Sequence, residues 1–186
     1  MKLSIKYMVS LRCILIVKGI LQKMGIQFTN VQLGEVEISE KLSSDQWLIL
    51  DKKLKKLGLE LLEDKRAILI DRIKCVIVEM IHYADDLPKI NFSEYLSSKL
   101  KYDCTYMSNL FSETEGITIE HYILKHKIEK VKELIIYDEL NFSEIAYKMH
   151  YSSAAHLSRQ FKSITGLTPT FFKSLKLHKR NSLDQL

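Results

Sequence analysis

The stretch YSSAAHLSRQFK, residues 151–162, carries side chains that suit contact with a polyanion. Arg159 can donate two parallel hydrogen bonds to a guanine edge, the commonest specific contact in a DNA major groove. An intramolecular ion pair is the alternative for Arg159, although few acids lie nearby in the sequence. Hydroxyl and ammonium groups that can position a phosphate surround it: Ser152, Ser153, Ser158 and Lys162.

The remaining outward residues of this stretch are small or aromatic. Ala154 and Ala155 offer only methyl contact with thymine. His156 has two interpretations that the sequence leaves open: contact with a base or phosphate, or packing that stabilises the preceding turn.

These residues belong to a duplicated frame. The tetrapeptide Asn-Phe-Ser-Glu occurs at 91–94 and again at 141–144, and each copy has the form of a capping box that starts a helix. A three-residue break and a second helix follow in each copy, about 104–114 and 153–164, with Gly116 and Gly166 just past the ends. Two short helices joined by a tight turn predict a helix-turn-helix in each copy, about 91–116 and 141–166.

The second helix of the first copy offers different chemistry. Its outward residues are uncharged: Thr105, Tyr106, Ser108 and Asn109. Asn109 matches the place of Arg159 and would read adenine. Residues 90–139 carry six Lys against nine acids, whereas residues 140–180 carry seven Lys and Arg against one acid. The first copy is therefore expected to hold a polyanion less tightly than the second.

Residues 117–138 separate the copies with a helical pattern. About 20 residues span roughly 30 Å as a helix, and one turn of B-DNA is about 34 Å. The spacing predicts that one chain holds two reading helices about one groove repeat apart. A Met and aromatic stripe is expected to form the core around them: Tyr95, Met107, Phe111, Phe142, Phe161, Phe171 and Phe172.

The second copy also resembles the signature of AraC/XylS-type transcription regulators. The segment IAYKMHYSSAAHLSRQFKSITGLTPTFFK, residues 145–173, matches that pattern, with His150 where the family usually has glycine. The resemblance implies seven helices within residues 66–178 and sequence-specific binding of promoter or operator DNA, with RNA polymerase as a further partner to test. Four basic residues that follow are expected to touch the DNA backbone or to form a solvated tail: Lys173, Lys176, Lys179 and Arg180.

The N-terminal third alternates strand and helix patterns. Strand-like runs at 2–8, 26–33, 35–39 and 59–63 are separated by helical patterns at 11–25 and 43–58. This βαββαβ order predicts a ferredoxin-like domain over residues 1–63, with two helices on one face of a four-stranded sheet, followed by an all-α domain over residues 64–186. In this chain it stands where the family usually has a cupin-like sensor domain, so a regulatory or interaction role is expected.

The segment MVSLRC, residues 8–13, is similar to the metal-binding loop of heavy-metal-associated domains in copper chaperones. Those loops hold a soft metal between two thiolates, whereas here Ser10 replaces the first and only Cys13 remains. A metal-handling or metal-sensing protein is thus the alternative function. Cys13 as a small apolar residue, or as a redox-sensitive thiol at a helix N-terminus, are the other interpretations, and no cofactor is expected.

Composition limits the remaining classes. The 186 residues carry a formal net charge of +5 and three widely spaced cysteines, which favour free thiols in a reducing compartment. The apolar run 13–17 is too short and too charged at its flanks to cross a membrane, and no signal-peptide cleavage pattern follows, so a cytoplasmic protein is expected. The sequence has no Gly-rich phosphate loop, no HExxH motif and no Cys/His/Asp nucleophile set, so an enzyme is not expected. The free face of the N-terminal sheet could form a homodimer.

Overall fold

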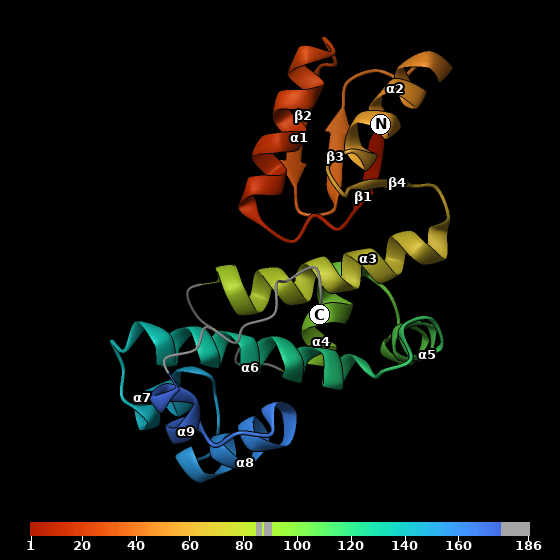
Figure 1. Ribbon diagram of the computed structural model, residues 1–186. Helices are drawn as coiled ribbons and strands as arrows, with labels where there is room; N and C mark the ends of the chain where they lie inside the picture. The colour runs from red at the N-terminus through yellow and green to blue at the C-terminus, as the bar shows by residue number, and fades with distance from the viewer. Residues whose placement is uncertain (85–86, 88–90, 176–186) are drawn as a thin grey trace. The chain divides into compact units, whose positions relative to one another are not determined.

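The computed structural model describes residues 1–84, 87 and 91–175, and the chain divides into two compact units, Met1–Val76 and Ile77–Leu186 (Figure 1). The division falls inside α3 (Lys65–Val78), a helix of 14 residues. The domain boundary predicted between residues 63 and 64 precedes this helix and stays a prediction.

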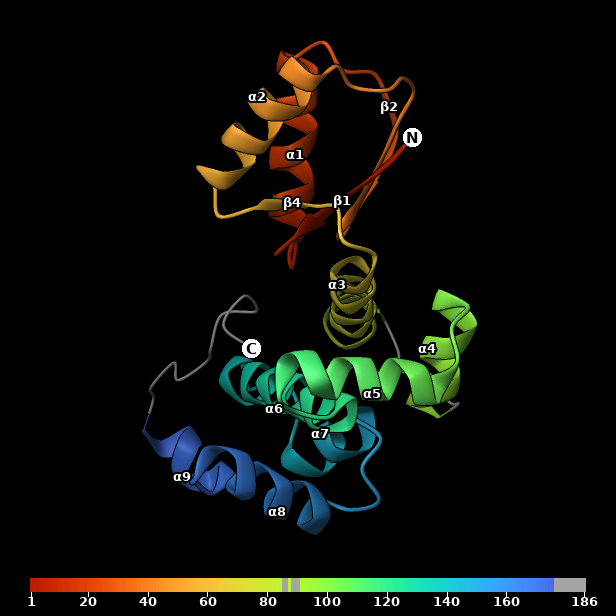
Figure 2. The same ribbon diagram turned by 90° about the vertical axis from the view of Figure 1, so that its right-hand side faces the viewer.

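The N-terminal unit contains a four-stranded antiparallel sheet with two helices on one face (Figure 2). Its elements are β1 (Lys2–Lys6), α1 (Leu11–Lys23), β2 (Phe28–Gln32), β3 (Glu35–Ile38), α2 (Ser44–Lys55) and β4 (Glu60–Leu62). The strand order is β2-β3-β1-β4, and every pairing is antiparallel. The predicted order of strands and helices is therefore confirmed.

The register of β1 explains why this sheet buries one core. Leu3 lies opposite Val36 of β3, and Ile5 lies opposite Leu61 of β4, so apolar side chains meet across three strands. The two helices add fully buried aliphatic side chains: Val17, Leu21, Leu50 and Leu54.

Tyr7 corrects one sequence-based expectation. The strand predicted over residues 2–8 alternates, and this alternation places Tyr7 on the same side as Leu3 and Ile5. The strand ends at Lys6 instead, and Tyr7 adopts a left-handed φ of 67° with 42% of its surface exposed. Its backbone N–H donates to the Asp71 carboxylate, so a hydrogen bond from the turn outweighs ring burial.

α3 brings a buried acid to the turn between β2 and β3. A Cβ at Gly34, which has φ 74°, would lie 2.7 Å from the Cys75 sulfur, so a side chain there would displace Cys75. The Cys75 thiol donates to Asp71 at 3.6 Å. Burial raises the pKa of Asp71 to about 6, although the hydrogen bonds from Cys75 and Tyr7 oppose this shift.

The C-terminal unit is helical, and we call it the helical unit. After α3 and a π-helical turn, η1 (Glu79–Tyr83), its helices are α4 (Phe92–Leu100), α5 (Cys104–Glu115), α6 (Ile119–Tyr137), α7 (Phe142–Lys148), α8 (Ala154–Thr165) and α9 (Pro169–Ser174). The helical character of this region and the two predicted pairs of short helices are thus confirmed. Among the described helices, none is both long and apolar enough to cross a bilayer.

The caps of the two copies differ. Asn141 accepts from the N–H groups of Ser143 and Glu144, and the Glu144 carboxylate accepts from the Asn141 N–H at 2.7 Å, which completes the predicted capping box. Among the described residues, the Asn91 side chain accepts only from the Ser93 N–H, at 3.0 Å. The prediction of a complete box at both copies was therefore wrong for the first.

Each turn between the paired helices uses one left-handed residue. His150 has φ 55°, so histidine performs the role expected of glycine. In the first copy Lys101 has φ 62°, one place later relative to the fifty-residue offset. α7 accordingly ends sooner than α4, while Asp103 and Ser153 cap the next helices at matching places.

Candidate nucleic-acid interface

We call α5 and α8 the reading helices, because they carry the predicted DNA contacts. From here on, the first unit is the helix-turn-helix of α4 and α5, and the second unit is that of α7 and α8. Each reading helix is fixed from the core side in the same way. Phe111 of α5 meets Tyr122 edge to face at 5.4 Å, and Phe161 of α8 meets Phe172 at 5.5 Å. The fifty-residue register thus continues past the helix-turn-helix into the first turns of α6 and α9. These turns pack against the buried sides of α5 and α8.

Arg159 projects from α8 into solvent. The described part of the chain gives it no ion-pair partner, and the apolar side of its helix is fixed by buried Leu157 and Phe161. Lys162, on the same helix, is also exposed. The guanidinium is therefore free to meet a ligand, whereas its predicted base contact stays a prediction.

The N-terminal turn of α8 uses several predicted contacts internally. The Ser153 hydroxyl accepts from the His156 N–H at 3.1 Å as the helix cap. The Ser152 hydroxyl lies 3.0 Å from His156 Nδ1, and the His156 ring packs edge to face on Tyr151 with centroids 5.3 Å apart. These contacts favour the turn-stabilising interpretation of His156.

A hollow of about 660 Å³ adjoins the reading helix α8. Its walls come from the end of α6 and from the first turns of α7, α8 and α9. Ala154, Ala155 and Ser158 form the α8 side, so three residues with predicted DNA contacts also line this hollow. Lys173 also lines the hollow, and its ammonium forms an ion pair with Asp138.

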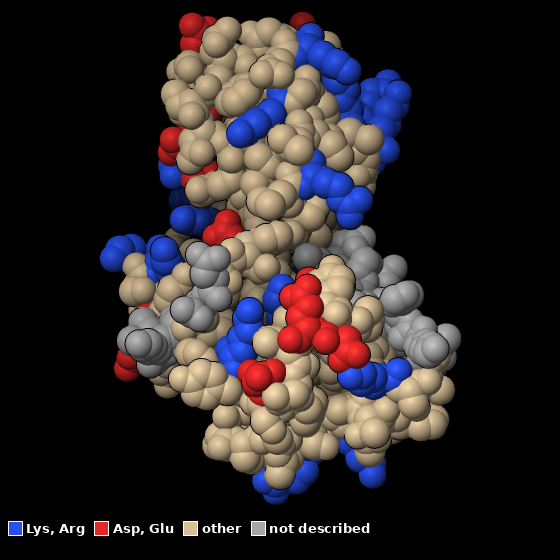
Figure 3. Space-filling view, turned by 90° about the vertical axis from the view of Figure 1, so that its left-hand side faces the viewer, with Lys and Arg blue, Asp and Glu red and all other residues tan. Residues whose placement is uncertain are grey.

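The four basic residues predicted to touch the DNA backbone or form a solvated tail divide into two groups, since Lys173 lies within α9 and the others follow it. Lys173 is exposed but forms an ion pair with Asp138. A DNA phosphate would therefore have to compete with the Asp138 carboxylate for the Lys173 ammonium. Lys176, Lys179 and Arg180 lie outside the described residues. Figure 3 shows one face of the helical unit, where acidic side chains gather in the middle, with basic side chains beside them and further basic ones along the lower margin.

The reading helix of the first unit exposes uncharged groups. Thr105, Tyr106 and Asn109 are exposed, and Ser108 is half-buried, so the predicted outward set is brought to one side of α5. No Lys or Arg occurs in α5, whose sequence is CTYMSNLFSETE. Tyr102, which stacks on Tyr106, was not selected from the sequence, although its four-place spacing from Tyr106 was a signal.

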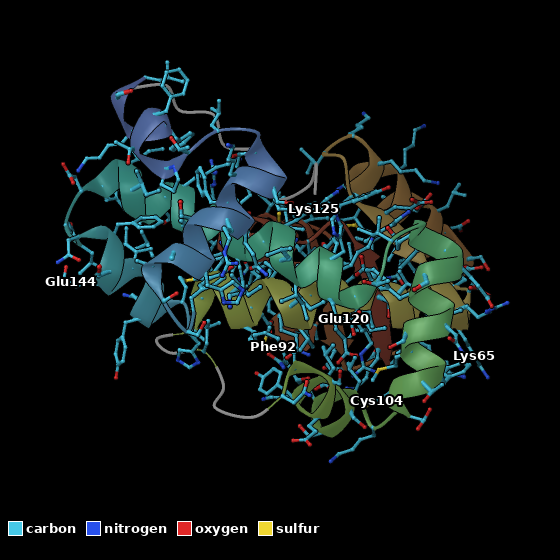
Figure 4. All side chains as sticks on the ribbon, turned by 90° about the horizontal axis from the view of Figure 1, so that it is seen from below. Lys65, Phe92, Cys104, Glu120, Lys125 and Glu144 are labelled. Atoms are coloured by element: carbon cyan, nitrogen blue, oxygen red, sulfur yellow. The ribbon has the colours of Figure 1, made fainter. Side chains whose placement is uncertain are left out.

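α6 joins the two units through a polar interior that the sequence did not reveal. Figure 4 shows α6 running between the region of Phe92 and Cys104 and the region of Glu144. The Lys127 ammonium lies 4.3 Å from the Tyr151 ring centroid and 5.7 Å from that of Phe92, one ring from each unit. Burial lowers the pKa of Lys127 to about 8. This contact ties both units to one helix face.

A histidine pair lies on the same helix. His126 Nδ1 is 3.1 Å from His82 Nε2, and the His126 ring is fully buried against Tyr122. Burial lowers the pKa of His126 to about 3, with smaller contributions from His82 and Lys125, so this imidazole is neutral at physiological pH. It therefore acts as a core group of α6.

Cys13 lies at the start of α1 with its sulfur 3.3 Å from the Ser10 hydroxyl. Within the described residues, no group of three or more His, Cys, Asp or Glu side chains is arranged to hold a metal ion. The metal-handling alternative therefore has no observation in its favour.

Comparison with known proteins adds to this geometry. Residues 96–174 match the model of a helix-turn-helix domain. An uncharacterized HTH-type transcriptional regulator of Staphylococcus aureus is 30% identical over 99 residues, which cover 53% of this chain and 13% of that protein. The Bacillus subtilis HTH-type transcriptional regulator YtdP is 24% identical over 100 residues, 54% of this chain and 13% of that protein. The match therefore spans a small part of each relative.

A solved structure shares the fold. The C-terminal domain of AraT, a response regulator from Geobacillus stearothermophilus, superposes with a TM-score of 0.50 at 23% identity, covering 64% of this chain and 94% of that one. The family match and the two capped helix-turn-helix units agree in position with this likeness. Residues 96–174 of this chain are therefore similar to a helix-turn-helix domain in sequence, and the helical region shares its fold with that solved domain.

Proposed function

We propose that this protein is a sequence-specific DNA-binding transcription regulator that reads two adjacent major-groove segments with α5 and α8. The observation that carries the proposal is the pair of helix-turn-helix units, each with an exposed polar side chain at the matching place, Asn109 and Arg159. Nothing in this role calls for catalysis, and we infer a cytoplasmic protein.

The length of α6 supports simultaneous contact by both units. Its 19 residues make a helix of roughly 28 Å at about 1.5 Å per residue. Successive major-groove segments on one side of B-DNA are about 34 Å apart. A continuous helix of this length, packed against α5, α7, α8 and α9, is stiff enough to set that separation.

Roles follow from chemistry and exposure. Arg159 would donate to a guanine, Asn109 would pair with an adenine, and Ala155 would meet a thymine methyl group. The remaining predicted contacts would hold the sugar–phosphate backbone: Thr105, Tyr106, Ser108, Ser152, Ser153, His156, Ser158, Lys162 and Lys173. Since Ser152, Ser153, His156 and Lys173 already have partners in the protein, their contribution is expected to be smaller than that of Lys162.

The N-terminal unit would receive a signal or a partner. We infer that residues 1–63 form a ferredoxin-like domain, because the strand order β2-β3-β1-β4 with antiparallel pairing and two helices on one face is the arrangement of that fold. Homodimerisation through this unit and contact of the protein with RNA polymerase are further proposals.

Selection of bound fragments from a random duplex library tests the proposal directly. We expect one enriched sequence, bound with an affinity that falls steeply as salt rises because cationic side chains displace counterions. Enrichment of no sequence, or tight binding indifferent to salt, would overturn it. The selected duplex then serves as the probe for every variant below.

A further inference from the structure

Two tyrosines in the first unit stand where the second unit has a serine and a histidine. Tyr102 and Tyr106 match Ser152 and His156 at the fifty-residue offset. The tyrosine rings stack with centroids 6.1 Å apart and planes 20° apart, whereas Ser152 Oγ bonds to His156 Nδ1 at 3.0 Å. Both pairs fasten the turn to the first turn of the reading helix, but they expose different chemistry.

The tyrosine pair is exposed and held in place. Tyr102 and Tyr106 keep 44% and 47% of their surface in solvent. The Ser97 hydroxyl donates to the Tyr102 carbonyl at 2.7 Å, and the Tyr106 N–H donates to the Asp103 carboxylate at 2.9 Å. Because the backbone is fixed and each ring restrains the other, a partner that covers them orders little that is not already ordered.

The surroundings of the pair exclude a mainly ionic contact. α5 has no cation, and acids stand at its two ends, Asp103 and Glu115. Lys101, in the preceding turn, is the one basic residue between Leu100 and the end of α5. A polyanion that meets this helix therefore finds ring faces, methyl groups and hydroxyls, and few charges to pair with.

We propose that the Tyr102–Tyr106 pair is the main DNA contact of the first unit, with its ring faces against deoxyribose and thymine methyl groups. A tyrosine hydroxyl donates to a phosphate oxygen in the same contact. The inference rests on the proposed function and names the part of the DNA that the first unit takes: a thymine-containing edge held by apolar area. Such a contact releases no counterions, so it adds affinity without adding salt dependence.

The test compares affinity with salt dependence in the full-length chain on the selected duplex. We expect Tyr102→Ala and Tyr106→Ala to weaken binding about tenfold at every salt concentration, with an unchanged slope of log affinity against log salt. Lys162→Ala should instead lower that slope by about one. Tyr106→Phe, which keeps the ring, should remain within about threefold of wild type because the ring face supplies most of the contact.

Two controls separate contact from folding. Tyr137, 62% exposed at the end of α6 and outside both reading units, serves as the matched tyrosine, and Tyr137→Ala should bind like wild type. Circular dichroism and the thermal midpoint of each variant should match wild type, because Tyr102 and Tyr106 lie outside the buried core and keep nearly half of their surface in solvent. A variant that fails this check is replaced by Tyr102→Ser or Tyr106→Ser.

Removing the thymine methyl groups identifies the surface contacted. A duplex with uracil in place of thymine in the first half-site should bind wild type more weakly, and this penalty should disappear in Tyr106→Ala. Alanine variants that bind like wild type, alter the salt slope, or keep the full uracil penalty would overturn the pair as the contact while leaving DNA binding intact. A wild-type chain that binds no duplex would instead overturn the proposed function.

Discussion

Asn109 and Arg159 occupy the same place in two copies of one unit. The exchange of an amide for a guanidinium at this place changes which base each reading helix is suited to contact. An amide can both donate to and accept from adenine, whereas a guanidinium only donates and suits guanine. Arg159 is exposed with no ion-pair partner among the described residues, so its full charge faces outward.

Arg159→Ala should weaken binding to the selected duplex by about 1–3 kcal/mol and relax preference at one base pair. Arg159→Lys is the control, because it keeps the charge and loses the paired donors. We expect the lysine variant to keep the salt slope and to lose the base preference, measured by competition with duplexes varied at each position. A lysine variant with unchanged preference would contradict the guanine contact.

Asp71→Asn should stabilise the folded protein at neutral pH. The folded carboxyl has a pKa near 6 against an ordinary value of 3.8, so the folded state binds the proton more tightly than the unfolded state does. Stability is therefore lost as pH rises from about 4 to 6 and stays lower above that range. The variant should gain up to about 3 kcal/mol at pH 7 and about half of that at pH 5.

Urea unfolding at both pH values measures this difference. Asp45→Asn is the matched control, since Asp45 is an exposed acid in the first turn of α2. A gain for Asp71→Asn that is equal at pH 5 and pH 7 would show that burial of the charge is not its cause.

At the scale of the elements, the two copies differ most where their first helices begin. Asn141 caps α7 with a complete reciprocal box, whereas Asn91 caps α4 through one hydrogen bond. α7 has 7 residues, too few to be stable without its caps and its packing. The cap at Asn141 thus contributes directly to the position of the turn before α8.

Asn141→Ala should lower the free energy of unfolding by about 1 kcal/mol, and Asn91→Ala should lower it by less. Thermal unfolding of the two variants side by side measures the difference. Equal losses would mean that the reciprocal bond from Glu144 adds nothing to the cap.

The sequence predicted the elements well because their signals are local. Cap residues, the glycines after the reading helices and the fifty-residue repeat lie within a few places of what they specify. Tyr7 was misplaced because a hydrogen bond to Asp71, 64 places away, overrode strand alternation. Phe171, predicted in the core, is 51% exposed, since the short α9 buries its neighbour Phe172 instead.

The candidate interface was predictable in part. Exposure of Arg159 and Asn109 followed from their phase against buried Leu157 and Met107. The internal bond of His156 was one of two open interpretations, because a histidine ring fits both. The aromatic contacts of Lys127 depend on how two units pack on one helix, which no local pattern encodes.

At the scale of the whole helical unit, the proposed two-site reading makes α6 a spacer of fixed length. Inserting 5 base pairs between the half-sites of the selected duplex turns the second by about half a helical turn, and affinity should fall at least about tenfold. Inserting 10 base pairs returns the second half-site to the same side of the duplex but doubles the separation between half-sites. The affinity should fall comparably, because α6 cannot stretch. Recovery of affinity with 10 added base pairs, measured by fluorescence anisotropy, would mean that the units move independently.

If α5 and α8 both contact the DNA, as we propose, their unlike exposed side chains give the bound complex a direction. A site matched to both helices has no two-fold symmetry, so a palindrome would satisfy one half of the protein and leave the other mismatched. One chain would then sit on its promoter in a single orientation, with the same end always toward the transcribed gene.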